Sequence, residues 1–116
     1  MNYRYALFAF NGEPMCFAHV LLNAGDMAKK GWDVKIVIEG TATRQIKELS
    51  DPSKPFAKLY QQVKESGLID CVCKACSTQT GSLESAREQA LPICDTMSGH
   101  PAISEYIDDG YQVLTF

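Results

Sequence analysis

Residues 33–39 read Asp-Val-Lys-Ile-Val-Ile-Glu, and this stretch decides the fold. Four of its seven residues are β-branched and apolar, with hardly an interruption. A run of this kind is typical of a strand that is covered on both faces, as strands of a parallel sheet are. Gly40 breaks the run directly after Glu39. The stretch therefore predicts a central strand of an α/β protein.

Strand and helix signals alternate on both sides of this strand. Strands are expected at residues 3–10, 68–73, 111–116 and, very briefly, 92–94. Helices are expected from Pro14 to Lys30, up to Leu49, from Phe56 to Gly67, from Ser82 onward and from His100-Pro101 to Gly110. Residues 77–81 are expected to form a polar loop. Such alternation predicts a mostly parallel sheet of about five strands in a three-layer α/β/α sandwich. The length predicts a single domain, residues 1–116.

Composition narrows the class of protein. The chain has 116 residues, a net charge of −3 and a sequence pI of about 5.3, which argue against nucleic acid or an anionic membrane as the main partner. No apolar run approaches the roughly 20 residues of a membrane span. The first residues lack the features of a signal peptide, so we expect a cytoplasmic protein. Five cysteines in a reducing compartment do not predict a disulfide framework; we expect buried, metal-bound or reactive thiols.

The chemistry of a parallel sheet belongs at the carboxyl ends of its strands, and one of these ends is rich in thiols. Residues 69–81 read Ile-Asp-Cys-Val-Cys-Lys-Ala-Cys-Ser-Thr-Gln-Thr-Gly. Cys73 and Cys76 form a C-x-x-C pair. Lys74 and the N-terminus of a helix starting near Ser82 would both favour the thiolate. The sequence therefore predicts a depressed pKa for Cys73.

Other interpretations of the cysteines remain open. Cys71 is best explained as a core residue, and Cys16 and Cys94 as structural. A C-x-x-C pair serves zinc sites, iron–sulfur sites and dithiol redox enzymes alike. A metal-binding module would use Cys71, Cys73, Cys76 and Cys94, with His100 also available, although the spacing is not that of a zinc finger.

Two further segments have a structural and a functional interpretation. His100 precedes Pro101 and is explained equally well by helix capping. Residues 40–44, Gly-Thr-Ala-Thr-Arg, could bind an anion at a helix N-terminus or simply cap that helix. No nucleotide-binding glycine motif and no serine-nucleophile motif is present.

The chain resembles the DsrE/DsrF-like sulfur-relay family over nearly its whole length. The resemblance rests on Asn11-Gly12-Glu13-Pro14 after the first strand, Glu39-Gly40 after the second, the spacing Cys73-x7-Gly81 after the third, and the closing segment from Gly110 to Phe116. Members of this family accept sulfane sulfur as a cysteine persulfide and pass it to the next carrier. The sequence departs from the family pattern at Thr80, where relatives often have arginine.

The resemblance implies a sulfur transferase or sulfur carrier. The reactive cysteine of the family corresponds to Cys73, and Cys76 matches a frequent second cysteine. We expect Cys73 to accept sulfur and Cys76 to assist release, so Cys76→Ser should leave loading intact; the reverse order stays open because Cys76 lies further into the loop. The resemblance also implies that no cofactor is needed, that sulfur donor and acceptor proteins are the partners, and that the chain forms a homotrimer or homohexamer.

Three other functions remain open, and the role of four aromatic residues is also open. The chain could instead be a dithiol redox module, a metal-binding module or a non-catalytic assembly subunit. Four aromatic residues on predicted helix faces could contribute to an oligomer interface or cover the sheet within one subunit: Phe56, Tyr60, Tyr106 and Tyr111.

Overall fold

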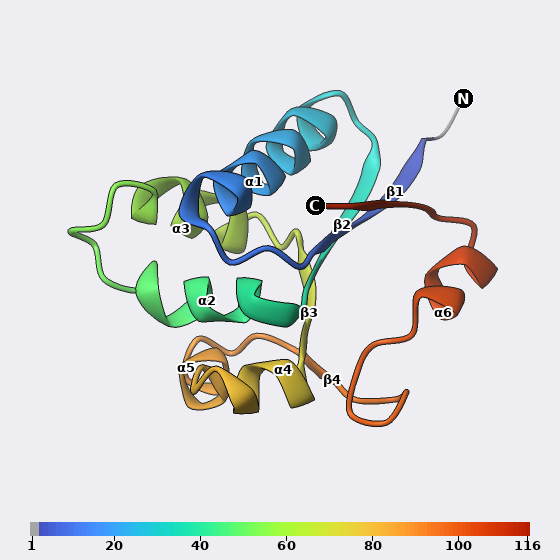
Figure 1. Cartoon of the computed structure of the whole chain (residues 1–116). Coiled ribbons are helices and arrows are strands. Elements are labelled where there is room, and N and C mark those ends of the chain that lie inside the picture. The colour runs from blue at the N-terminus through green and yellow to red at the C-terminus, as the bar shows by residue number, and fades with distance from the viewer. Residues whose placement is uncertain (1–2) are drawn as a thin grey trace.

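The computed structural model describes residues 3–116, which form one parallel sheet with helices around it (Figure 1). The sheet has five strands in the order β4-β3-β2-β1-β5, each parallel to its neighbours. The strands are β1 (Arg4–Ala9), β2 (Asp33–Ile38), β3 (Ile69–Cys73), β4 (Ile93–Cys94) and β5 (Gln112–Thr115). The stretch that predicted a central strand is indeed the middle strand, and the α/β prediction is confirmed.

Seven helical segments connect the strands. They are α1 (Pro14–Lys29), the 3-10 helix η1 (Gly40–Thr43), α2 (Arg44–Glu48), α3 (Ala57–Glu65), α4 (Lys74–Gln79), α5 (Leu83–Glu88) and α6 (Ile103–Asp108). Pro14 opens α1 as expected, and the Glu13 side chain caps it by accepting a hydrogen bond from the Cys16 N–H. No helix in the described part of the chain is both long and apolar enough to cross a membrane.

The two faces of the sheet carry unequal layers. The larger core joins one face to α1, α2, α3 and α5, and its fully buried side chains include Leu7, Phe17, Ile36, Ile46 and Tyr60. The smaller core lies on the opposite face, where α6 packs with Tyr106 and Ile103 over Ala6, Phe8, Val37, Cys71 and Tyr111. The molecule is therefore a three-layer sandwich with one thick and one thin outer layer.

The aromatic residues that could have formed an oligomer interface belong to these cores. Tyr60 and Tyr111 are buried, while Phe56 and Tyr106 are partly buried and pack against the same clusters. All four thus help to cover the sheet within this one chain. The homo-oligomer remains a prediction, because the contacts of these residues are explained without a second subunit.

One predicted element was wrong: most of the expected polar loop at residues 77–81 is helical. Helix α4 starts directly after β3, with Cys73 as its N-cap residue, and the Cys73 sulfur accepts a hydrogen bond from the Cys76 N–H. The hydroxyls of Ser77 and Thr78 bond back to the Lys74 carbonyl, so these polar residues support the helix. The helix N-terminus closest to the thiols is that of α4, not that of α5.

A second expectation, that the cysteines form no disulfide, was also wrong. Cys71 and Cys94 are disulfide-bonded, with their Cα atoms 5.8 Å apart. The parallel pairing of β3 and β4 brings the two residues together, since Cys94 lies in register with Cys73, two residues along from Cys71. The spacing of the cysteines in the sequence could not show this disulfide, because the pairing of β3 with the two-residue strand β4 brings Cys71 and Cys94 together. A metal module built on Cys71 and Cys94 is therefore incompatible with the structure.

Candidate functional site

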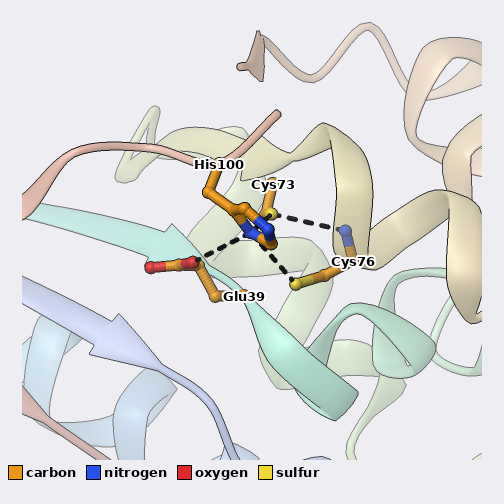
Figure 2. A group of neighbouring side chains, drawn as sticks. All are labelled: Glu39, Cys73, Cys76 and His100. Carbon is orange, nitrogen blue, oxygen red and sulfur yellow. Dashed lines mark hydrogen bonds and ion pairs between the residues drawn. The ribbon is translucent and has the colours of Figure 1, made fainter. Parts of the chain in front are cut away.

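Four side chains that can act as nucleophiles, bases or metal ligands meet at the carboxyl edge of the sheet. Glu39 follows β2, Cys73 ends β3, Cys76 lies in the first turn of α4, and His100 comes from the loop after β4. Figure 2 shows that they point toward one another. One donor atom from each lies within 4.8 Å of every other. The parallel topology thus brings residues from three separate regions of the chain into one cluster.

His100 is at the centre of the cluster. Its Nδ1 lies 3.1 Å from the Cys73 sulfur, 3.7 Å from the Cys76 sulfur and 3.9 Å from a Glu39 carboxylate oxygen. A neutral imidazole with an unprotonated Nδ1 can accept a proton from either thiol. The geometry therefore provides one base for two thiols.

The loop before His100 positions the imidazole. Met97 and His100 exchange backbone hydrogen bonds of 2.8 and 2.9 Å, which close the loop on itself. The Ala75 N–H donates to the Gly99 carbonyl at 2.9 Å and thereby ties the loop to the start of α4. Gly99 has a φ of +90°, and a Cβ there would lie 3.2 Å from the Ala75 Cβ. Glycine is favoured at this position both by its backbone conformation and by the close contact.

Glu39 is buried at the floor of the cluster. Its residue exposure is 6%, and burial raises the pKa of its carboxyl group while His100 opposes that rise. Gly40 turns the chain immediately afterwards, with a φ of +54°; a Cβ at Gly40 would lie only 2.8 Å from the Phe10 carbonyl oxygen. This turn ends β2, so Glu39 sits at the strand end beside the thiols.

The predicted depression of the Cys73 pKa was wrong. Burial raises the pKa of this thiol to about 12, although the hydrogen bond from the Cys76 N–H works in the opposite direction. Cys73 has no exposed surface, and the negative charge of Glu39 disfavours its thiolate further. The Lys74 ammonium lies 3.9 Å from an Asp95 carboxylate oxygen on the surface. Burial therefore favours the protonated form of the Cys73 thiol.

Cys76 is the thiol that faces solvent. It is half-buried and lines a cavity of about 480 Å³ together with Gly40, Thr41, Arg44, Thr80 and His100. A larger cavity of about 660 Å³ shares Arg44 and Thr80 with it but has neither cysteine nor histidine in its lining. Of these two cavities, the smaller one is therefore the one lined by a thiol and an imidazole.

Capping, one of the two interpretations of residues 40–44, was wrong, because neither η1 nor α2 has a side-chain cap hydrogen bond; anion binding at this segment remains a prediction. The Thr43 hydroxyl contacts the Gly40 carbonyl at 2.8 Å and the Thr80 hydroxyl at 2.7 Å, so Thr43 holds η1 against the end of α4. Arg44 is exposed and contributes a cation to the wall of the cysteine cavity.

The structure brings together Cys73 and Cys76 as the sequence suggested, and adds two residues to them. His100 was noted in the sequence but had an equally good explanation as a capping residue. Glu39 was noted only as the end of a strand; an acidic residue at the carboxyl end of a buried strand was the available signal. Cys16 is exposed on α1 and lines a different cavity, with His19.

The fold and the cysteine edge define a class: small parallel α/β proteins with a thiol pair where the third strand meets a helix. The family model described as DsrE/DsrF-like matches residues 7–116, and the chain belongs to that family. Membership suggests a role of the sulfur-relay type.

Similar proteins are themselves without an assigned function. An uncharacterized protein of Methanocaldococcus jannaschii is 30% identical over 96 residues, which are 83% of this chain and 76% of that protein. An uncharacterized protein of Archaeoglobus fulgidus is 44% identical over 36 residues, 31% of this chain and 97% of its own length. A solved structure of a conserved protein of unknown function from Bacteroides thetaiotaomicron shares the fold, with a TM-score of 0.67 at 15% identity, over 96% of this chain and 94% of that one.

Proposed function

We propose that this protein is a sulfur carrier that accepts sulfane sulfur as a cysteine persulfide and passes it to a partner protein. One observation carries the proposal: the Cys76 thiol lies in an open cavity, 3.7 Å from the His100 Nδ1, with the Cys73 sulfur behind it. A thiol beside a base can be activated, and a second thiol within reach can discharge what the first has accepted.

Exposure decides the order in which the two thiols act. The register of the family places the reactive cysteine at Cys73, but Cys73 is completely buried and its pKa is raised to about 12. A donor in the cavity meets Cys76 first, because Cys76 lines that cavity. We therefore assign acceptance of sulfur to Cys76 and release to Cys73, the reverse of the order that the resemblance implied.

Loading is a displacement at sulfur in which the Cys76 thiol is oxidised to a persulfide and the donor is reduced to a thiolate, so no external oxidant is needed. His100 Nδ1 takes the proton of the Cys76 thiol, and the thiolate attacks the outer sulfur of a polysulfide or persulfide donor. The bond from the Cys76 sulfur to that atom forms, the donor S–S bond breaks, and its electron pair leaves with the remainder of the donor. A partner thiolate reverses the step by attacking the outer sulfur, and the electron pair returns to Cys76.

Cys73 provides a second route of release. Its sulfur lies within 4.8 Å of the Cys76 sulfur, so a small rotation permits attack on the inner sulfur of the persulfide. A Cys73–Cys76 disulfide then forms and the outer sulfur leaves as hydrosulfide, which balances the electrons. A thiol whose pKa is high while it is buried is a suitable reserve, since it stays protonated until the site opens.

Intact-mass measurement on the reduced chain tests the proposal. After incubation with inorganic polysulfide, wild type should gain a sulfur adduct that a reductant removes. With adducts on the exposed Cys16 assigned separately by peptide mapping, Cys76→Ser should carry no adduct in the cluster, whereas Cys73→Ser should load there and retain the adduct longer. Cys16→Ser, which removes an exposed thiol on another helix, is the matched control and should load as wild type does.

Two other outcomes have definite meanings. Loading that survives in Cys76→Ser and vanishes in Cys73→Ser would restore the order that the resemblance implied. A Cys73–Cys76 disulfide that forms with any oxidant, with no sulfur adduct at any time, would favour the dithiol redox module, which the proximity of the two sulfurs also supports.

Partners and assembly belong to the same proposal. The donor and acceptor are proteins, and the chain forms a homotrimer or homohexamer in the cytoplasm. Light scattering behind a sizing column tests the assembly; a mass near 12.8 kDa would exclude it. The Cys71–Cys94 disulfide is the feature at odds with a reducing compartment, where disulfides are rare.

A further inference from the structure

We infer that Glu39, Cys73, Cys76 and His100 form a site for a single Zn²⁺ ion. This inference goes beyond the carrier function and does not depend on it. The residues come from three separate regions of the chain, and each offers a donor atom typical of zinc sites: two thiol sulfurs, an imidazole nitrogen and a carboxylate oxygen.

The distances suit a tetrahedral ion. Zinc binds sulfur at about 2.3 Å and nitrogen or oxygen at about 2.0 Å, so neighbouring ligand atoms lie roughly 3.3–3.8 Å apart. The contacts of the His100 Nδ1 with the Cys73 sulfur, the Cys76 sulfur and the Glu39 oxygen are 3.1, 3.7 and 3.9 Å. No pair of the four donor atoms exceeds 4.8 Å. Shifts of about 1 Å or less would complete the coordination sphere.

Glu39 supports a cation independently of the thiols. Its side chain is only 8% exposed, and among residues 3–116 its sole ion pair is the one with His100, at 3.9 Å. A buried carboxylate held by one distant partner gains more from an ion than an exposed carboxylate does. An ion bound between Glu39 and the thiols would offset that buried charge.

The surroundings of the cluster give the ion a route of entry, and they also provide a charge that compensates the charge of the complex. The cavity of about 480 Å³ reaches Cys76 and His100 from solvent. Zn²⁺ displaces the two thiol protons, so two thiolates, a carboxylate and a neutral imidazole leave the complex with one negative charge. Arg44 lines the same cavity and can compensate that charge. The ion would occupy both reactive thiols, so zinc binding and sulfur loading exclude each other.

The test is titration of the metal-free full chain, with Cys73 and Cys76 as free thiols and the Cys71–Cys94 disulfide intact, with Zn²⁺ against a chromophoric chelator, and with Co²⁺ as a spectroscopic probe. We expect one ion per chain, and tetrahedral cobalt bands with thiolate charge-transfer absorption. Cys76→Ser and His100→Ala should each weaken zinc binding by more than ~100-fold, beyond the 10–100-fold typical of changes outside the ligand shell. Because Cys73 is fully buried, the partly exposed Cys76 and His100 provide the variants least expected to disturb folding.

Two controls separate this site from the other thiols. Cys94→Ser and Cys16→Ser should bind zinc as wild type does, since neither residue belongs to the cluster. Absence of saturable binding, or equal affinity of wild type, Cys76→Ser and His100→Ala, would overturn the inference. Sulfur loading of metal-free protein is measured separately by mass, so either the carrier function or the zinc site can fail without the other.

Discussion

Strand β3 contributes one cysteine to each of two pairs, Cys71–Cys94 and Cys73–Cys76, and the surroundings of the two pairs give them different chemistry. Cys71 lies within the strand under the thin layer, where it is bonded to Cys94 and its sulfur is 3.4 Å from the Tyr106 hydroxyl. Cys73 is only two residues further along, but there the strand ends and α4 begins, so its sulfur meets a backbone N–H, an imidazole and Cys76. The four residues are all cysteines, so the difference between the pairs comes from their partners: a disulfide fixes Cys71 and Cys94, whereas an imidazole and an open cavity adjoin the free pair Cys73 and Cys76.

The largest expected effect is a difference in alkylation rate within the native protein. Cys76 should react with iodoacetamide at least ~1,000-fold faster than Cys73, because a buried thiol reacts only after a local opening that costs several kcal/mol. Peptide mass mapping after timed quenching measures both rates in one sample.

The other pair supplies the reference for this experiment. Cys71 and Cys94 should remain unlabelled until a reductant is added, while the exposed Cys16 should react rapidly throughout. Similar rates for Cys73 and Cys76 would remove the distinction between a surface acceptor and a buried resolving thiol.

The second effect concerns stability and should belong to the Cys71–Cys94 pair alone. The disulfide links residues 23 apart, and closing a loop of this length in the unfolded chain is worth about 3 kcal/mol. Cys94→Ser should therefore lower the free energy of unfolding by about this amount in urea titration. Cys76→Ser should change it far less. An equal loss in both variants would mean that the two pairs do not divide structure and chemistry between them.

The fold was predictable from sequence because its signals are local. The β-branched run of β2, the proline that opens α1 and the glycines that end helices each act within a few residues, and the order of elements followed from them. Helix α4 was missed because its cap is a cysteine sulfur rather than a hydroxyl or carboxylate. The polar sequence after Cys76 was typical of a loop.

The site was predictable only in part, for a physical reason. Cys73 and Cys76 are three residues apart, so one turn of chain brings them together. Glu39 and His100 join them only because β2 and β3 are neighbours and the loop after β4 folds back, through the Ala75–Gly99 hydrogen bond. The pKa of Cys73 depended on burial, which local sequence charge does not determine.

The third effect is a pH dependence that should distinguish Cys73 from an exposed thiol. Its pKa is about 12 in the folded chain, above the roughly 8.5 of an unperturbed thiol, so folding favours the protonated form. The stabilisation from the protonated Cys73 thiol is complete below pH ~8.5 and is lost as pH rises toward 12, by about 3 kcal/mol near pH 10.5.

Measurement of unfolding free energy between pH 8 and pH 10.5 tests this contribution. Cys73→Ala should show a smaller loss than wild type, and Cys16→Ala should keep the wild-type slope. The difference between variants isolates Cys73, because burial also raises the pKa of Tyr60 and Tyr106 in every variant. Equal slopes for Cys73→Ala and wild type would show that the Cys73 thiol is not held in its protonated form by the fold.

The smallest expected effect is on the rate of sulfur loading, and it concerns Arg44 in the cavity that the Cys73–Cys76 pair reaches. Arg44 lines the cavity of Cys76, and an exposed cation near a thiol is worth on the order of 1 kcal/mol to an approaching anion, or about fivefold in rate. Arg44→Gln should therefore slow loading by inorganic polysulfide about fivefold at low salt and less at high salt, since salt screens the attraction.

A neutral organic trisulfide should load both proteins at similar rates. Lys47→Gln, one turn further along α2 and outside that cavity, is the matched control and should change neither rate. If Arg44→Gln slowed loading by both donors, the role of Arg44 would instead be to maintain the shape of the cavity, as Thr43 and Thr80 do, and not to attract an anionic donor.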